Sequence, residues 1–159
     1  MMKLFQNFWK AVGSFFFLVL MIPLNSMTLS AYADCISAKK ANLRTEPTTK
    51  SSISWKVFQN MPLRKIKTEE NWVQVKDVDG QSHWIFHRLL TKDYTCAVIK
   101  VPKAHLRSGP GTQYQKIPGI AVAEKYTAFK FLLAKNGWAK LEDEYGQRLW
   151  VARKLIWVQ

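Results

Sequence analysis

The pattern of hydrophobic positions divides the chain into a short apolar leader and a longer segment in which polar and apolar residues alternate. Residues 11–24 are uncharged and mostly apolar, and no run of that kind recurs after residue 34. In the later segment the apolar positions come in short stretches bounded by turn residues, which is typical of β-strands and not of helices. We therefore expect the chain from residue 34 onward to be all-β.

The clearest predicted element is a hairpin. Residues 71–76 alternate polar side chains with Trp72, Val73 and Val75. The pair Asp79-Gly80 then marks a tight turn, and residues 82–86 supply the return strand. Further short strands are expected over residues 55–58, 63–67, 126–133, 138–141 and 149–151, whereas the apolar run 117–123 is ambiguous.

Two parts of this segment resemble each other in the same order along the chain. Leu43-Arg44 is matched by Leu106-Arg107, and the spacing between Trp72 and Trp84 equals the spacing between Trp138 and Trp150. Several ordered matches with one modest change of length indicate an internal duplication. We therefore expect two small domains, over residues 34–95 and 96–159.

The residues of each copy resemble the bacterial SH3-like domain family. The first copy carries Leu43-Arg44 before a turn, then the hairpin around Asp79-Gly80, then Trp84-Ile85. In the second copy, residues 106–112 (LRSGPGT) are the part most similar to the opening of that family. The resemblance implies two tandem small SH3-like barrels, which in this family usually lack catalysis and often serve cell-wall targeting.

The leader has the order of a secretory signal peptide. Lys3 and Lys10 precede the apolar run, and the small-residue pattern Ala31-Tyr32-Ala33 follows it. This predicts a signal peptide over residues 1–33, with cleavage between Ala33 and Asp34. The protein would then be periplasmic or secreted, and it would meet the membrane only transiently, during export.

Two alternatives to a cleaved signal peptide remain open. A membrane anchor needs about 20 apolar residues, and this run is shorter and interrupted by Pro23. Lipidation at Cys35 would require a small residue before the cysteine, and Asp34 fits that position poorly.

The charge of the chain narrows the choice of partner. The formal net charge is +13, and loss of Lys3 and Lys10 with the leader would leave +11. Such a surface favours anionic partners, and export argues against nucleic acid. The expected partner is therefore peptidoglycan or an envelope protein.

Cys35 and Cys96 are the two cysteines of the chain. In an oxidising compartment an even pair suggests a disulfide. Two separate thiols, or a cysteine nucleophile paired with a histidine, are the alternatives.

Four tryptophans occupy equivalent places in the two copies, namely Trp72, Trp84, Trp138 and Trp150. Because small barrels have few large residues for a core, we expect these four to be structural, although a ligand-stacking surface is the alternative. Trp55 and Tyr114 are better candidates for an aromatic binding groove. Arg44 and Arg107 either contact an anion or brace the adjoining loop.

The remaining motifs do not predict a metal, a cofactor or an active site. Asp77 to Gly80 resembles the start of a calcium loop, but the later ligand positions and the flanking strands favour a hairpin turn. His83 and His87 lack a third ligand nearby. We therefore expect an exported, non-catalytic binding protein and not an enzyme. An accessory subunit of an envelope enzyme, a cysteine-dependent cell-wall hydrolase and a nucleic-acid binder are the alternative functions.

Overall fold

The computed structural model describes residues 33–159, so the predicted signal peptide lies outside the described residues, apart from Ala33. Within the described range the elements are strands and two three-residue 3-10 turns, without an α-helix, and the prediction of an all-β chain is confirmed. No helix in this range is long and apolar enough to cross a membrane.

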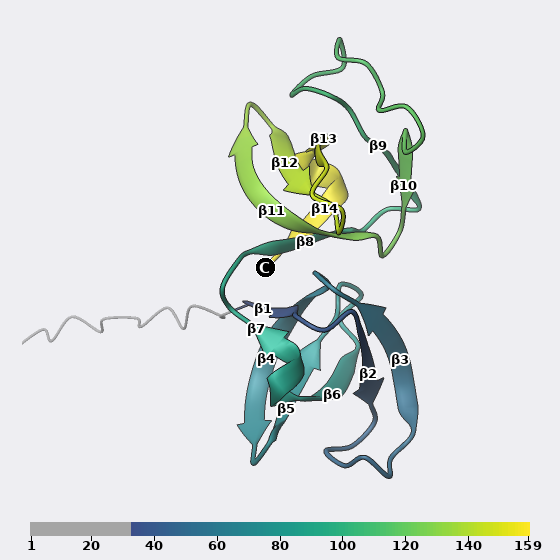
Figure 1. The fold of residues 1–159 in the computed structure, drawn as a ribbon. Coiled ribbons are helices and arrows are strands. Elements are labelled where there is room, and N and C mark those ends of the chain that lie inside the picture. The colour runs from purple at the N-terminus through teal and green to yellow at the C-terminus, as the bar shows by residue number, and fades with distance from the viewer. Residues whose placement is uncertain (1–32) are drawn as a thin grey trace, which may run out of the picture.

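The first half of the molecule is a seven-stranded sheet with the strand order β3-β2-β6-β5-β4-β1-β7, the lower half of Figure 1. Its strands are β1 (Ala33–Ile36), β2 (Lys40–Arg44), β3 (Ile53–Phe58), β4 (Pro62–Glu69), β5 (Trp72–Lys76), β6 (Ser82–Phe86) and β7 (Leu90–Thr91). The turn η1 (His87–Leu89) connects β6 to β7.

The second half contains a five-stranded sheet with the order β13-β12-β11-β8-β14 and a two-stranded sheet of β9 and β10. Its elements are β8 (Cys96–Ile99), β9 (Lys103–His105), β10 (Val122–Glu124), β11 (Ala128–Lys135), β12 (Trp138–Glu142), β13 (Arg148–Ala152), η2 (Arg153–Leu155) and β14 (Ile156–Val158). The ambiguous run 117–123 forms a loop that leads into β10.

The hairpins β5–β6 and β12–β13 are built in the same way. Each turn has a glycine at a left-handed φ, 83° at Gly80 and 81° at Gly146, a region that favours glycine because it has no Cβ. Asp77 and Asp143 each use Oδ1 to accept two backbone N–H groups of their own turn, at 2.8–2.9 Å. These local rules explain why the hairpins could be located in the sequence.

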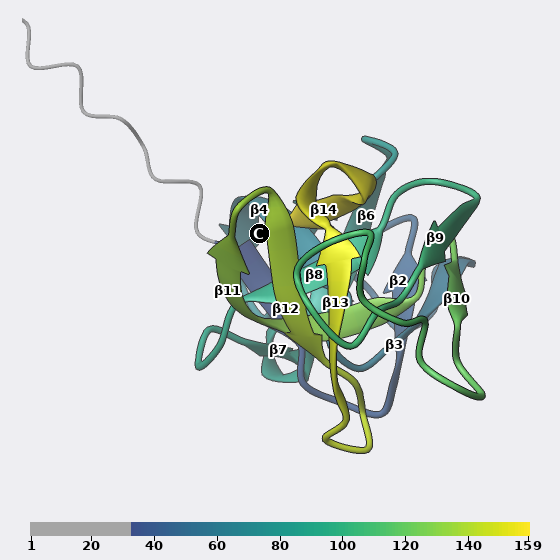
Figure 2. The same ribbon diagram turned by 90° about the horizontal axis from the view of Figure 1, so that it is seen from above.

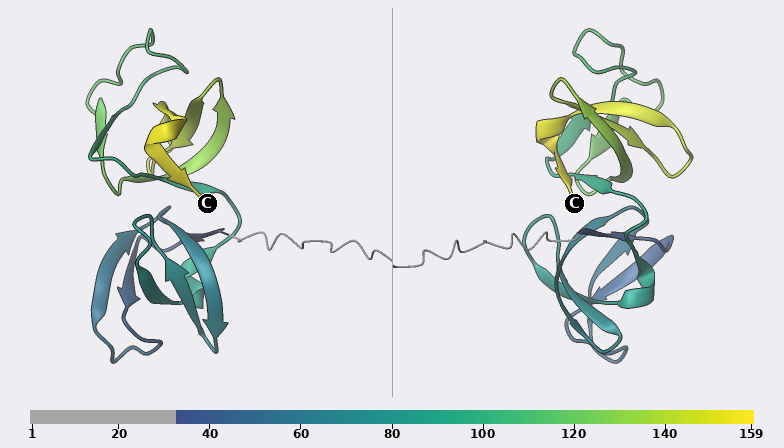
Figure 3. Two further views of the ribbon diagram at one scale, coloured as in Figure 1. Left: turned by 180° about the vertical axis from the view of Figure 1, so that it is seen from behind. Right: turned by 90° about the vertical axis from the view of Figure 1, so that its left-hand side faces the viewer.

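Each half has its own apolar core. Ile36, Leu43, Leu63 and Ile85 are fully buried in the first cluster, and Leu141, Leu149 and Ile156 are among those buried in the second. Val98 of β8 belongs to the first cluster although its strand lies in the second sheet, and Trp157 of β14 also packs there. The two halves are therefore stacked with β8 and β14 at the contact (Figures 1 and 3).

The structure confirms the predicted disulfide. Cys35 of β1 and Cys96 of β8 are bonded, with their Cα atoms 5.9 Å apart and both side chains fully buried. The bond thus joins the sheet of the first half to the sheet of the second, which lies over it in the view of Figure 2.

The strand order corrects the expectation that each half is a closed barrel. Over residues 33–159 the pairing of the first sheet runs from β3 at one edge to β7 at the other, and that of the five-stranded sheet from β13 to β14. Neither sheet closes on itself through this pairing, so the observed architecture is an all-β chain of open, strongly curved sheets.

Candidate functional site

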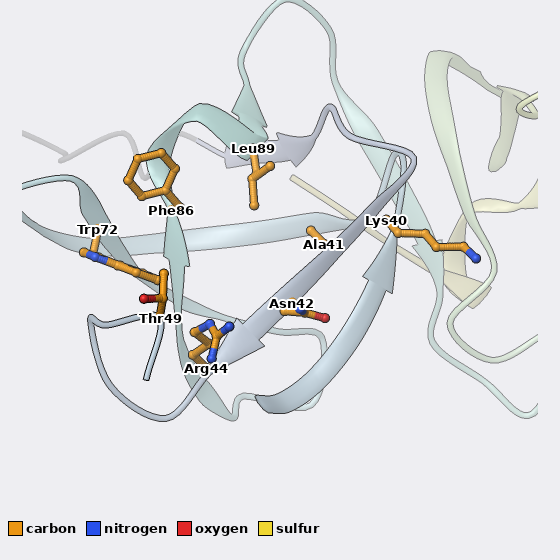
Figure 4. Close-up of a pocket in the computed structure, with 8 residues that line it drawn as sticks. All are labelled: Lys40, Ala41, Asn42, Arg44, Thr49, Trp72, Phe86 and Leu89. Carbon is orange, nitrogen blue, oxygen red and sulfur yellow. The ribbon is translucent and has the colours of Figure 1, made fainter. Parts of the chain in front are cut away.

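A groove of about 380 Å³ opens on the first half of the molecule. Strand β2, the loop after it, and the β5–β6–η1 segment form its walls (Figure 4). The eight residues that line it are Lys40, Ala41, Asn42, Arg44, Thr49, Trp72, Phe86 and Leu89.

Strand β2 supplies the polar wall of the groove through its alternation. Ala41 and Leu43 are buried, whereas Lys40 and Asn42 are exposed on the other face of the same strand. This period of two is the geometric consequence of strand pleating. Burial of the two apolar residues therefore fixes where the lysine and the amide point.

The aromatic wall comes from the hairpin β5–β6. Trp72 and Phe86 lie directly opposite each other in the strand register, and their rings meet edge to face with centroids 5.7 Å apart. Both rings are half-buried, so each keeps part of its surface open to a ligand. Aromatic pairs of this geometry are rigid and favourable.

Arg44 ties the loop to the groove. Its Nη1 donates to the carbonyl oxygen of Ser51 at 2.5 Å, and the Ser51 hydroxyl in turn donates to the carbonyls of Glu46 and Thr48. Of the two roles left open for this arginine, loop bracing is therefore the one observed. A guanidinium has five N–H donors, so further donors are left to meet an anion in the groove.

The groove is positively charged. Lys40 and Arg44 line it, and none of the eight lining residues is acidic. Together with the two aromatic rings and the Asn42 amide, this favours a ligand that combines carboxylate groups with flat or weakly polar surfaces.

The four predicted binding residues do not form one site. Only Arg44 lines the groove. Trp55 lies at the contact between the halves, edge-on to the ring of Tyr126 with centroids 5.1 Å apart. Arg107 donates from Nη1 to the carbonyls of Thr112 and Tyr114, at 2.8 and 2.6 Å, and so braces the corresponding loop of the second half.

Tyr114 lies on that second loop with 41% of its surface exposed. Its ring packs so closely over Gly109 that a Cβ added there would lie 2.2 Å from Cδ1 of the tyrosine. Tyr114 is therefore a candidate contact on the second half and not a part of the groove.

The four tryptophans expected in the cores differ in how deeply they are buried. Trp84 is buried, with 8% exposed, whereas Trp72, Trp138 and Trp150 are half-buried. The expectation that all four build the cores is corrected accordingly, because their strands place them on the outer face. Lys67 stacks over Trp84 and Lys140 over Trp150, at 5.0 and 5.9 Å from the ring centroids.

Several groove residues were missed by the sequence analysis, namely Lys40, Asn42, Thr49, Phe86 and Leu89. The alternation around Ala41 and Leu43 contains the signal for the first two. Phe86 lies opposite Trp72 because the turn comprises residues 77–81, whereas a two-residue turn at Asp79-Gly80 would have placed His87 there.

The histidines do not form a metal site. His83 is buried and lies 3.1 Å from Asp77 through Nε2, whereas His87 is exposed beside the ring of Phe86. Among residues 33–159, no group of three or more His, Cys, Asp or Glu side chains is placed to hold a metal ion.

Comparison with known proteins gives a family match within the first half of the chain. Residues 37–92 match the family model described as the bacterial SH3 domain. Over 142 residues the chain is 25% identical to a curated protein of Bacillus subtilis (strain 168), named "Putative N-acetylmuramoyl-L-alanine amidase YrvJ". The alignment covers 83% of this chain but only 27% of that relative.

Solved structures with some similarity include an NlpC/P60 family protein from Bacillus cereus ATCC 10987, with a TM-score of 0.37, 12% identity and coverage of 80% of this chain and 56% of that one. Another is NlpC1 from Trichomonas vaginalis, with a TM-score of 0.35, 10% identity and coverage of 79% and 45%. At TM-scores this low, neither likeness supports a conclusion.

The relative contradicts two of our expectations. It is named as an amidase, so the predictions of a non-catalytic binding protein and of a protein that is not an enzyme are wrong. Both had relied on the family resemblance and on the lack of a recognisable active-site motif in the chain. A chain that spans about a quarter of the length of its relative gives no basis for that conclusion.

Proposed function

We propose that this protein acts in peptidoglycan hydrolysis as a cell-wall hydrolase, and that the groove on its first half holds the wall polymer. The groove is the observation that carries the proposal, because it combines two aromatic rings with Lys40 and Arg44 within the segment that matches the bacterial SH3 domain. The similarity to a protein named as an N-acetylmuramoyl-L-alanine amidase supports the choice of polymer and of reaction.

The chemistry of the groove fits such a polymer. Peptidoglycan presents sugar rings and short peptides that end in carboxylates. The half-buried faces of Trp72 and Phe86 suit the sugar rings, and Lys40 with the free donors of Arg44 suits a carboxylate. The volume of about 380 Å³ is enough for a sugar or for a few peptide residues.

The proposal includes two SH3-like units over residues 34–95 and 96–159. Support comes from the matching hairpins, each followed by a 3-10 turn and a short strand, and from the matching arginines. Arg44 and Arg107 both pair their backbone with a tryptophan, Trp84 or Trp150, and both brace a loop through Nη1.

The proposal also includes export. Peptidoglycan lies outside the cytoplasmic membrane, so its hydrolase has to cross that membrane. The basic and apolar leader with cleavage between Ala33 and Asp34 would provide for this, and the working protein would be periplasmic or secreted.

Co-sedimentation with purified peptidoglycan tests the proposal. The full chain is incubated with insoluble peptidoglycan across a salt series, and the pelleted protein is measured together with the new alanine amino groups released by amide cleavage. We expect pelleting that weakens as salt rises, because exposed charges are screened over about 10 Å at 0.1 M, together with a time-dependent release of amino groups.

The double variant K40A/W72A removes one cation and one ring from the groove and should lower both readouts about tenfold or more. Its matched control is K135A/Y145A, which removes the same kinds of side chain from exposed positions of the second half. Equal pelleting of the two variants, or polymer binding without release of amino groups, would contradict the proposal.

A further inference from the structure

Three side chains of the first half form a continuous chain of hydrogen bonds. The Ser54 hydroxyl lies 2.8 Å from Nδ1 of His83, and Nε2 of His83 lies 3.1 Å from Oδ2 of Asp77. The other carboxylate oxygen of Asp77 accepts the backbone N–H groups of Asp79 and Gln81. The carboxylate is thus held at both oxygens, and it holds the imidazole in turn.

This arrangement sets the direction of each hydrogen bond. An ionised carboxylate can only accept, so Nε2 of His83 carries the hydrogen that it donates to Asp77. In the neutral imidazole Nδ1 is then the acceptor, and the Ser54 hydroxyl donates to it. The proton of the serine therefore already points at a base, which is the geometry that activates a serine nucleophile.

A nucleophile has to be accessible to its substrate, whereas the groups that orient it can be buried, and the three side chains fit this pattern. Asp77 and His83 are buried, with 7% and 8% exposed, whereas Ser54 is exposed. Strand β3 is an edge strand of its sheet. Its register against β2 passes from Trp55, opposite Leu43, to Ile53, opposite Arg44, and leaves Ser54 without a partner in a bulge. Bulges occur next to active sites because they re-aim a side chain and leave backbone groups free.

The second half provides an internal comparison. Asp143 makes the same two turn hydrogen bonds as Asp77, but Leu149 occupies the place that corresponds to His83 and is fully buried. In the register of the two hairpins Leu149 lies opposite Leu141 and His83 lies opposite Val75. The hairpin therefore folds around an apolar residue at this place, and the turn does not explain the buried imidazole of the first half.

We propose that Ser54, His83 and Asp77 form an acyl-transfer centre, with Ser54 as the nucleophile, His83 as the general base and Asp77 as the positioning residue. The substrate class is an acyl group in ester or amide linkage. The inference deepens the proposed function by naming reacting groups for the hydrolase, and it rests on that function only for the identity of the natural substrate.

The reaction balances without a cofactor. Oγ of Ser54 bonds to the acyl carbon while its proton moves to Nδ1 of His83, and the bond to the leaving group breaks as that group takes the proton. A water molecule then attacks the acyl carbon of the Ser54 ester and gives a proton to His83. The ester bond breaks, Ser54 regains its proton, and a free carboxylic acid leaves.

The centre lies close to the groove along the fold. Arg44 on the groove wall pairs with Ile53 of β3, the residue before Ser54. A polymer held at Arg44 would therefore pass within about one strand of β3, given the spacing of about 4.8 Å between neighbouring strands.

Labelling of the full chain with a fluorophosphonate tests the proposal directly, because this reagent class bonds to activated serine hydroxyls. Mass spectrometry of the digested protein should place the adduct on Ser54, and hydrolysis of p-nitrophenyl acetate should exceed the rate without protein. The variants S54A and H83L should lower both by about 100-fold or more, the usual contribution of a general base. H83L copies the residue of the second half, so the fold is expected to be retained.

Two further variants separate chemistry from structure. S52A removes a nearby exposed hydroxyl of the same segment and should label like the parent chain. D77N keeps an oxygen for the turn but presents an amide to Nε2, which reverses the tautomer of His83. It should therefore lose labelling while its urea midpoint changes little.

The absence of an adduct on Ser54 in the parent chain would overturn the inference, as would equal labelling of the parent chain and H83L. Peptidoglycan binding that is unchanged in K40A/W72A, with normal labelling of Ser54 in the parent chain, would instead count against the groove. The two proposals can therefore fail separately.

Discussion

At the scale of single residues, two aspartates show how position decides the behaviour of a carboxylate. Asp79 accepts hydrogen bonds from Nζ of Lys125 at 2.8 Å and from the hydroxyl of Tyr126 at 2.6 Å, and these contacts lower its pKa. Burial raises the pKa of Asp34, an effect opposed by the charges of Lys92 and Lys65. The first carboxylate joins the two halves as an anion, and the second is held near the disulfide at a cost in solvation.

Replacing Asp79 by asparagine should weaken the contact between the halves in a pH-dependent way. Because its folded pKa lies below the ordinary 3.8, the carboxylate contributes stability that is present above pH 3.8 and lost as the pH falls through the folded value. The D79N variant should therefore unfold at lower urea than the parent chain at pH 7, and the difference should shrink when the pH is lowered to about 3. The effect should be small, because Asp79 is 39% exposed and solvent screens the pair.

E144Q is the control, since Glu144 is an exposed carboxylate in the turn of the β12–β13 hairpin. A constant difference between D79N and the parent chain at both pH values would show that shape, and not charge, carries this contact.

At the scale of elements, the equivalent turns of the two hairpins allow the stability effects of two matched substitutions to be compared. Removal of the Asp143 side chain leaves the N–H groups of Tyr145 and Gln147 without their acceptor, so D143A should lower the free energy of unfolding by about 1–2 kcal/mol. D77A removes the same two bonds and also leaves the buried His83 without its carboxylate. Its loss should be about twice as large.

Urea unfolding of the two variants gives the comparison. Equal losses would mean that the Asp77–His83 bond adds nothing to stability, and the charge state assumed for the pair would have to be abandoned.

These elements also show what a sequence can reveal about this fold. The hairpin at Asp79-Gly80 follows from local rules, because a tight turn needs a residue that accepts a left-handed φ. The groove does not, since it depends on which strands become neighbours. From the sequence alone, Trp72 is predicted to be a core residue. The strand register places it opposite Phe86, where both rings are half-buried and form a wall of the groove.

The Ser54 centre was hidden for a related reason. Ser54 and His83 are far apart in the chain, and no serine motif surrounds Ser54. Their side chains form a hydrogen bond because Ser54 lies in a bulge of β3 and the buried His83 of β6 lies within reach of it. Bulges and long-range side-chain contacts leave little trace in the hydrophobic pattern, whereas the all-β class followed from that pattern and the disulfide from the pair of cysteines.

At the scale of the whole molecule, the halves are joined by several contacts of different kinds. The Cys35–Cys96 disulfide is buried at one point, Trp55 meets Tyr126 at another, and Lys125 reaches Asp79. Val98 of the second sheet is packed in the first core. These contacts together hold the two halves in a fixed relative orientation.

Removal of the disulfide tests how much the covalent bond, compared with the apolar contacts, contributes to the stability of the molecule. The bond closes a loop of 61 residues, and in the chain-entropy model such a loop restricts the unfolded chain by about 4 kcal/mol. The variant C35A/C96A should therefore unfold at clearly lower urea than the oxidised parent chain. Because Val98 and Trp157 still pack against the first core, its two halves should unfold together in a single transition.

Urea titrations followed by tryptophan fluorescence and by far-ultraviolet circular dichroism measure both features, and the reduced parent chain is the control for the mutations themselves. Coincident transitions at a lower midpoint are the expected result. Two separate transitions would show that the disulfide alone holds the halves together, and the apolar contact through β8 would then have to be regarded as too weak to fix their orientation. An unchanged midpoint would show that the unfolded chain is already as compact without the bond, which would remove the entropic basis of the prediction.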